Sequence, residues 1–278
     1  MATNTSSATV WSSTLASAPP RRTSGLVRAE WTKMRTVRST VWTLLAMAVI
    51  TLGIAALATS TIASRWNTFS PLRRLTFDPT SMSLRGLLFS QLIIGVLGVL
   101  VMSAEYGTGT IRATLAAEPR RARVLIAKSA VFFVLAAVVG EVLAFGGFAI
   151  GQSMLTSPVP HATLSQPGVL RAVMGGGLVI AVLGLFALGL ATIIRHSAGA
   201  ITAYVGVLLV VPIILQTLPS SFSEPILKFM PFTISNAMTS VASQGSTAFS
   251  PWVGFSILVG YAIVSLAIGG WLLAKRDA

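Results

Sequence analysis

The residues most able to form charged contacts gather in one short segment, SAEYGTGTIRATLAAEPRRARVLIAK, residues 103–128. It contains two glutamates, four arginines and a lysine, although charged residues make up only 10% of the chain. Basic side chains of this kind attract anionic lipid headgroups, and charged side chains of both signs bind complementary groups on a partner protein. The elements on either side of the segment must explain why so much charge is placed there.

No residue pattern in the chain points to an enzyme. The absence of cysteine excludes disulfides, thiolate metal sites and cysteine nucleophiles. The two histidines, His161 and His196, are not paired with carboxylates at metal-ligand spacing, so we expect both to be loop residues. Lys128 is the one lysine followed by serine or threonine, but alanine precedes it where a Walker A loop has glycine. We therefore predict no catalytic residue, no metal site and no cofactor bound by this chain.

A lone acidic residue inside an apolar stretch is a second candidate for function. Glu141 lies within FFVLAAVVGEVLAFGGF. An acid at the centre of a membrane helix costs about 3 kcal/mol, so its side chain should face protein or water. It can line a substrate path or pair with a cation such as Arg171, or it can be a protonated acid hydrogen-bonded inside the helix bundle. The sequence favours neither reading over the other.

The apolar segments around these residues predict a membrane protein. The chain is 54% hydrophobic with a mean hydropathy of +0.81, whereas soluble domains carry about 25% charged residues. About 20 consecutive apolar residues span a bilayer as a helix, and the short alternating segments of a membrane barrel are not seen. We therefore predict an all-α integral membrane protein with six transmembrane helices near 41–62, 86–104, 124–150, 172–194, 199–218 and 252–273.

The chain divides into a tail and a membrane domain. Residues 1–24 are rich in Ser, Thr and Ala and have no periodic apolar face, so we predict a disordered tail. Residues 25–278 form the predicted six-span domain. It opens with residues 25–38, which have the spacing of a helix lying along the membrane surface.

That predicted interfacial helix has an apolar and a basic face. Val27, Trp31 and Met34 recur at i, i+4 and i+7, while Arg28 and Arg35 lie on a different face. Tryptophan favours the headgroup level, and arginine pairs with anionic lipid. A plain cytoplasmic stretch before the first span is the alternative.

The distribution of basic residues predicts the orientation. Fourteen lysines and arginines flank the side that carries both termini, and six lie on the other side. The positive-inside rule therefore places both termini in the cytoplasm of a multi-pass plasma-membrane protein. Four arginines in the first outer loop run against this trend. The net charge of +13 sits at span ends and no aromatic residues are interleaved to stack on bases, so nucleic acid is not an expected partner.

Prolines interrupt the two longer outer connections. Pro71 and Pro79 argue against one continuous helix over 63–85. In the connection over 219–250, EPILKFMPFTISNAM is apolar but is broken by Pro225 and Pro231. We expect a short re-entrant or interfacial pair of helices there.

The charged segment now has a predicted structure. Glu105 ends the second span, and Gly107 and Gly109 allow a sharp backbone turn. A short helix over about 110–118 follows, stopped by Pro119, before the chain re-enters the membrane. A helix tied to two spans can convert a push from a soluble partner into tilt of both. A basic loop that only fixes topology is the alternative.

This segment resembles the motif that follows the second span in permease subunits of ABC-2 type transporters. The matching residues are Glu105, Tyr106, Gly109, Thr110, Ile111 and Arg112, followed by Pro119, Arg120 and Arg121. LVRAEWTKMRTVRSTVW is similar to the elbow helix of that family, and residues 229–239 resemble its outer re-entrant segment. The resemblance covers residues from about 25 to 275.

The resemblance implies specific partners. Two permease chains, identical or homologous, pair with two ABC ATPase subunits, and ATP and Mg are bound by those ATPases. The short helix docks in a groove of the ATPase, where Glu105 and Arg112 make charged contacts. Substrate crosses between the two permease chains, lined by spans one, two and five, most often outward. Few fixed polar groups in the spans suit a small amphipathic substrate.

Three other readings remain open on the sequence alone. An ion-gradient-driven secondary transporter needs several membrane-embedded ionisable residues or an inverted repeat, and one acid is present. A non-transporting membrane anchor or assembly factor needs neither. A membrane-bound enzyme needs a nucleophile–base pair or a metal cluster within the spans, which the sequence does not contain.

Overall fold

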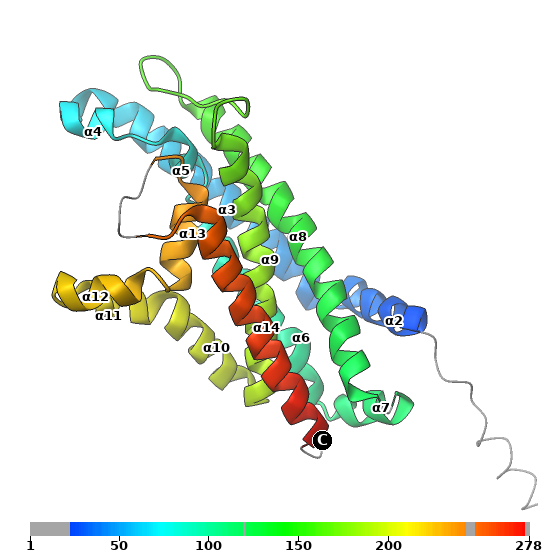
Figure 1. Cartoon of the computed structure of the whole chain (residues 1–278). Coiled ribbons are helices and arrows are strands. Elements are labelled where there is room, and N and C mark those ends of the chain that lie inside the picture. The colour runs from blue at the N-terminus through cyan, green and yellow to red at the C-terminus, as the bar shows by residue number, and fades with distance from the viewer. Residues whose placement is uncertain (1–22, 119, 243–247, 276–278) are drawn as a thin grey trace, which may run out of the picture.

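The computed structural model describes residues 23–118, 120–242 and 248–275, and every regular element in these ranges is helical (Figure 1). The tail predicted over 1–24 falls outside this part of the chain except for its last two residues, which begin the first helix. The elements are α2 (Thr23–Thr36), α3 (Arg38–Arg65), η1 (Trp66–Thr68), α4 (Pro71–Leu75), α5 (Pro79–Ser83), α6 (Leu87–Gly107), α7 (Thr110–Ala117), α8 (Arg121–Met154), α9 (Val169–Ile194), α10 (Ser197–Val205), η2 (Gly206–Val210), α11 (Val211–Gln216), α12 (Ser220–Leu227), α13 (Pro231–Thr239) and α14 (Pro251–Lys275).

The predicted fold class is confirmed. Six helices of the described residues are long and apolar enough to cross a membrane: α3, α6, α8, α9, α14 and the composite helix Ser197–Gln216. Each coincides with a predicted span. The third span is longer than expected, because α8 continues without a break for 34 residues, well past the predicted end at 150.

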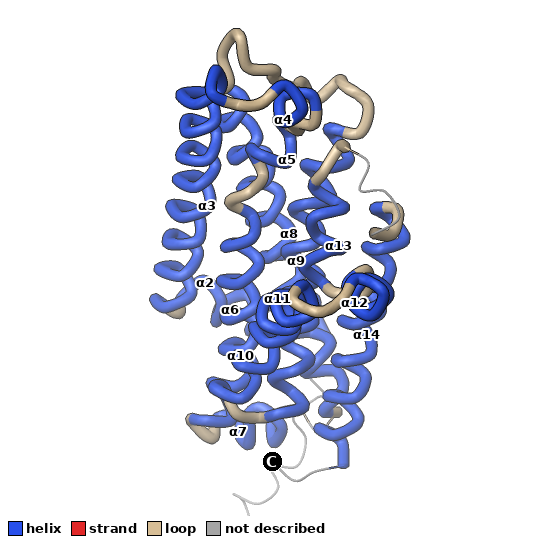
Figure 2. The backbone as a smooth tube through the Cα atoms, turned by 90° about the vertical axis from the view of Figure 1, so that its left-hand side faces the viewer, coloured by secondary structure: helices blue, strands red, loops and turns tan. Residues whose placement is uncertain are grey.

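Helix α9 forms the centre of the bundle and packs against α6, α8 and α14 (Figure 2). In its apolar stretch 67% of the residues are buried, compared with 17% in α3 at the periphery. Small residues allow this close approach, since helices without bulky side chains at their contact can bring their backbones together. The most central helix is therefore also the one richest in glycine, with GGG at 175–177.

The fifth span is a composite of α10, a π-helical turn η2 and α11. Pro212 follows the π turn, and its missing N–H is incompatible with an unbroken ladder of hydrogen bonds. The fully buried Tyr204 of α10 lies directly over Gly95 of α6, where any larger residue would collide with its ring. Its hydroxyl donates to the carbonyl oxygen of Gln91 at 2.8 Å, so the fifth span is fixed to the second.

Two of the connections beyond the spans contain short helices that begin at or near prolines. Helices α4 and α5 begin at Pro71 and Pro79, and the connection over 219–250 contains the pair α12 and α13. Helix α13 packs against α9 and α14, so its residues are largely buried. The predicted pair of short helices is therefore present, with α13 supported by protein.

Three side chains at this end, which we call the Asp78 cluster (Asp78, Gln152 and Arg171), bind backbone groups of neighbouring connections. The Oδ1 atom of Asp78 accepts hydrogen bonds from the amides of Thr80 and Ser81 at the start of α5. Its Oδ2 atom accepts from Ser240 Oγ at 3.0 Å and from the amide of Val241 at 2.8 Å, directly after α13.

Arg171 and Gln152 complete the Asp78 cluster. Arg171, in the first turn of α9, donates to the carbonyl oxygens of Met238 and Ser240. Gln152, near the end of α8, donates to the carbonyl of Pro79 and to Ser83 Oγ, and accepts from the amide of Ala162. Connections distant in sequence are thereby fastened into one layer.

Candidate functional site

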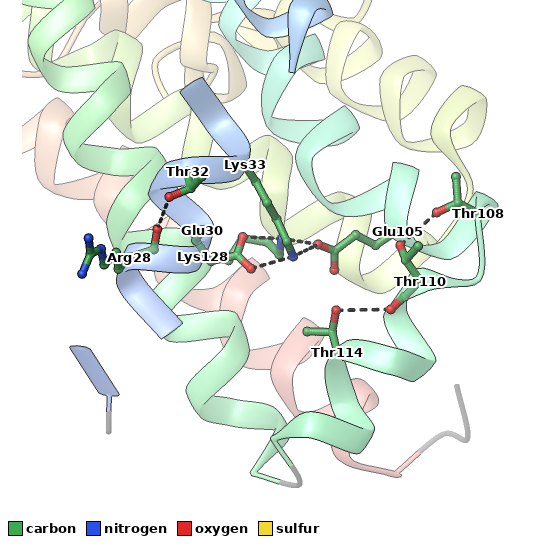
Figure 3. Close-up of polar contacts among 9 residues, drawn as sticks. All are labelled: Arg28, Glu30, Thr32, Lys33, Glu105, Thr108, Thr110, Thr114 and Lys128. Atoms are coloured by element: carbon green, nitrogen blue, oxygen red, sulfur yellow. Dashed lines mark hydrogen bonds and ion pairs between the residues drawn. The ribbon is translucent and has the colours of Figure 1, made fainter. Parts of the chain in front are cut away.

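Four charged side chains meet at the α7 end of the bundle and form what we call the Lys128 cluster: Glu30, Lys33, Glu105 and Lys128 (Figure 3). Lys128 Nζ donates to Glu30 Oε2 and Glu105 Oε1, both at 2.8 Å. Lys33 Nζ donates to Glu30 Oε1 at 3.0 Å and to Glu105 Oε1 at 2.9 Å. The two carboxylates and two ammonium groups balance in charge and join α2, α6 and α8.

Burial makes the members of the Lys128 cluster dependent on one another. The side chain of Lys128 is 2% exposed and that of Glu30 is 6% exposed, whereas Lys33 is 47% exposed. A buried charge is costly unless it is paired and hydrogen-bonded, so Lys128 requires both carboxylates. Burial alone would lower the pKa of Lys33, but its bonds to Glu105 and Glu30 outweigh that effect and raise the pKa above its ordinary value.

Helix α7 follows α6 through a tight turn at the same end. Gly109 has φ +70°, a left-handed conformation that non-glycine residues seldom adopt, while Gly107 remains helical. Ile111 and Leu115 are 3% and 9% exposed and pack into the main core. Arg112 lies on the exposed side of α7. The predicted short helix therefore exists with one face bound to the bundle.

Two arginines fix the end of the last span to this region. Arg121 Nη1 donates to the carbonyl oxygen of Leu273 at 2.8 Å, and Arg195 Nη2 donates to that of Leu272 at 3.3 Å. Carbonyls in the last turn of a helix have no partner within it, and a cation there also complements the helix dipole. Arg195 additionally lies over the ring of Tyr106, 5.2 Å from its centroid.

The predicted partner-contact residues fall into different positions. Glu105 is a buried member of the Lys128 cluster, at 9% exposure, whereas Arg112 is exposed. Thr110 begins α7 with its hydroxyl 2.9 Å from that of Thr108. Arg120 is exposed at the start of α8 and Arg121 is half-buried. Pro119 lies outside the described residues.

The residues of the predicted apolar face of α2 lie in two different environments. Met34 is buried at 7% exposure, but it shares its buried face with Leu26 and Glu30, spaced i, i+4 and i+8. Val27 and Trp31 are each 39% exposed and point away from the bundle. The two arginines of the predicted basic face, Arg28 and Arg35, are exposed. The face of α2 that packs against the bundle therefore contains the buried acid Glu30, and the face that carries Trp31 is exposed.

Glu141 lies in the middle of α8, against Gly177 of α9. Its Oε2 atom is buried and has no hydrogen-bond partner among the described residues. Arg171, one possible cation partner left open by the sequence, instead donates to the carbonyls of Met238 and Ser240 at the end of α13. His161 and His196 lie in the connections, and His196 caps α10 by accepting from the amide of Gly199. No group of three His, Cys, Asp or Glu side chains that could hold a metal ion occurs in the part of the chain that the structure describes.

Sequence reasoning missed three members of the Lys128 cluster: Glu30, Lys33 and Lys128. Glu30 is the one acid in the basic segment before the first span, and Lys128 lies four residues inside the predicted third span. A lysine at that depth requires a buried anion. Those two observations together would have predicted the pair, but the distance of 98 residues between them concealed it.

Comparison with known proteins agrees with this architecture. The sequence model of a family described as ABC-2 family transporter protein matches residues 26–212, from α2 into the fifth of the six spans. No match was found among curated proteins. The family is a membrane-spanning transport component that works with ABC ATPases and is not itself catalytic. Since the match covers more than half of the sequence, the chain belongs to the ABC-2 family of transporter proteins.

Proposed function

We propose that this chain is the permease subunit of an ATP-driven exporter in the plasma membrane, with both termini in the cytoplasm. Two separate ATPase subunits bind ATP and Mg, and a second permease chain, identical or homologous, completes the substrate path. The observation that carries the proposal is the position of α7, a short helix held between two spans by buried contacts on one face and exposed on the other.

The link from α7 to the spans is direct. Gly109 joins α7 to the end of α6, and α8 begins only four residues after α7 ends. The Lys128 cluster then ties α6 to α8 and both to α2 through side-chain ion pairs. A displacement of α7 by an ATPase therefore moves the ends of α6, α8 and α2 as one unit. Such coupled rigid-body movement is a common way to open and close a path.

The periphery of the bundle supports a second permease chain. The apolar stretches of α3 and of the fifth span are 17% and 28% buried, the lowest values along with α14. Large apolar side chains such as Leu57 and Ile213 lie uncovered on them, at 67% and 60% exposure. These faces meet lipid or another transmembrane helix, and the family resemblance implies a path lined by spans one, two and five. We assign the second permease chain to this side.

Arg112 offers the sharpest test of ATPase docking. Arg112→Glu reverses one charge on the exposed face of α7 and leaves Ile111 and Leu115 in the core. We expect co-purification of the partner ATPase with the permease to fall at least tenfold, measured by quantitative pull-down from detergent-solubilised membranes. Arg73→Glu, the same exchange on α4 at the opposite end, is the matched control and should bind normally. An undiminished complex with Arg112→Glu would argue against docking through α7.

A further inference from the structure

A cavity of about 450 Å³ opens at the α5 end of the bundle. It lies between α3, α5, the first turns of α6 and α13, and none of its residues belongs to the Lys128 cluster. Pockets of about 300–1,000 Å³ with an apolar wall and a few placed polar groups are typical of small-molecule sites. The polar groups on its wall are Ser81, Arg85, Gln91, Ser235, Asn236 and Thr239.

Gln91 gives this cavity an unsatisfied polar atom. Its side chain is 3% exposed, and its Nε2 atom donates to Ser235 Oγ of α13. The buried Oε1 atom has no hydrogen-bond partner among the residues that the structure describes. Reversing the amide would satisfy the oxygen with Ser235 and leave the nitrogen unpartnered, so one polar atom stays free in either orientation. A buried polar group in this condition costs about 1–3 kcal/mol, which a bound ligand can recover.

Arg85 places a cation at the mouth of the same cavity. Its side chain is exposed and makes no hydrogen bond or ion pair within the residues that the structure describes. Asp78, the acid that precedes α5, already accepts hydrogen bonds at both oxygens. From Glu105 to Leu87 the 18 residues of α6 rise about 27 Å, close to the thickness of a bilayer core. Arg85 therefore stands at the headgroup level opposite the Lys128 cluster.

A second cavity of about 360 Å³ adjoins the first and shares Ile54 and Arg85 with it. Its other walls are almost entirely apolar and follow one side of α3. The residues of α3 are Leu57, Ala58, Thr61 and Ile62, and Met82 of α5 completes the wall. The two cavities thus form a groove with a polar section, an arginine at the junction and an apolar section along a membrane helix.

We propose that this groove binds a single-chain amphiphile with an anionic headgroup. The headgroup pairs with Arg85 and accepts hydrogen bonds from Asn236 and from Gln91 Nε2, which is free to donate when the amide is reversed and Oε1 accepts from Ser235 Oγ. The chain lies along α3 between Ile54 and Ile62. This proposal rests on the proposed function, because it names the class of substrate that the exporter would carry. That substrate would occupy the groove at the outer side of the membrane. The binding step itself needs no ATPase and no ATP.

The test measures binding to the permease alone in zwitterionic nanodiscs. The probe is dansylaminoundecanoic acid, a fluorescent fatty acid, compared with its uncharged methyl ester. We expect saturable binding of the acid, a loss of at least tenfold in affinity for Arg85→Gln, and a similar loss for Asn236→Asp, which places a like charge on the exposed α13 site. Binding of the methyl ester should change less than threefold in both variants.

Arg65→Gln is the matched control, because Arg65 is an exposed arginine at the same end of α3 that lines neither cavity. Unchanged affinity in that variant supports the groove. Equal losses for Arg65→Gln and Arg85→Gln would overturn the proposal, since they would show attraction to the surface charge only. Full affinity in Arg85→Gln would overturn it as well. Because no ATPase is present, either result leaves the docking experiment on Arg112 unaffected, and failure of that experiment leaves binding in the groove intact.

Discussion

The two ends of the bundle are held together by different chemistry. At the α7 end, the Lys128 cluster joins three helices through contacts between long charged side chains. At the α5 end, the Asp78 cluster binds mainly backbone amides and carbonyls of the connections. Side chain–backbone bonds fix the path of the chain itself, whereas side-chain ion pairs fix helices relative to one another and leave their backbones intact when they move.

This difference matches the tasks proposed for the two ends. At the α7 end, the Lys128 cluster lets α2, α6 and α8 move together as one unit, because its ion pairs join side chains of these three helices. The α5 end cannot rearrange without breaking bonds to backbone amides, so it keeps the shape of the groove beside Arg85. Ion pairs are also the more fragile arrangement, because removing one buried partner leaves the others uncompensated.

We expect the largest effect on stability from removal of Lys128, which tests whether the α7 end depends on its buried ion pairs. Lys128→Met leaves Glu30 and Glu105 buried with only the half-exposed Lys33 between them. We expect a loss of about 3–5 kcal/mol in unfolding free energy, measured by denaturation of the purified protein in detergent. Lys33→Met, the same change at an exposed site, should cost less than about 1 kcal/mol. Equal losses in the two variants would contradict the central position of Lys128.

A smaller and more local effect is expected at the other end. Asp78→Asn keeps one acceptor oxygen, so it can satisfy either the amides of α5 or those after α13, but not both. We expect a loss of about 1–3 kcal/mol, because buried donors lose their partner. Hydrogen exchange at the amides of Thr80 and Val241 should accelerate, while Lys128→Met leaves these amides protected. Uniform acceleration throughout the bundle in Asp78→Asn would remove the distinction between the two ends.

We expect the smallest effect on stability from a change at Glu141, which lies between the two ends of the bundle. Glu141→Gln replaces a carboxyl whose Oε2 atom has no partner, so we expect expression and unfolding to change by less than about 1 kcal/mol. Transport by the assembled complex in proteoliposomes should nevertheless fall, if the carboxyl lies on the substrate path. Transport at the wild-type rate would show that the carboxyl of Glu141 is not needed for transport. The charged groups relevant to the comparison would then be those of the Lys128 and Asp78 clusters.

The spans and the short helices were predictable because their signals are local. Uninterrupted apolar runs predict spans from length alone, and Pro71, Pro79 and Pro231 each mark the start of a helix. Gly109 likewise predicts the turn before α7, since its left-handed backbone suits glycine. Each of these features depends on residues within a few positions of one another.

The charged clusters were not predictable because their partners are remote in sequence. Glu30 and Lys128 are 98 residues apart, and Asp78 binds the amide of a residue 163 positions away. The buried face of α2 was not predictable for a related reason. Periodicity predicted Val27, Trp31 and Met34 as one face, but the buried face is set by the requirement of Lys128 for a carboxylate, which turns Glu30 inward.

The unbroken length of α8 has a geometric consequence for the whole transporter. Its 34 residues form a rod of about 50 Å, with Lys128 near one end and Gln152 near the other. Pivoting such a rod by about 5° around its midpoint carries each tip about 2 Å in opposite directions, a displacement of the size seen in helix shifts of switching proteins. Gln152 donates to Ser83 Oγ, which lies between the groove residues Met82 and Leu84, so the movement proposed at the α7 end would shift the α5 end and its groove as one piece.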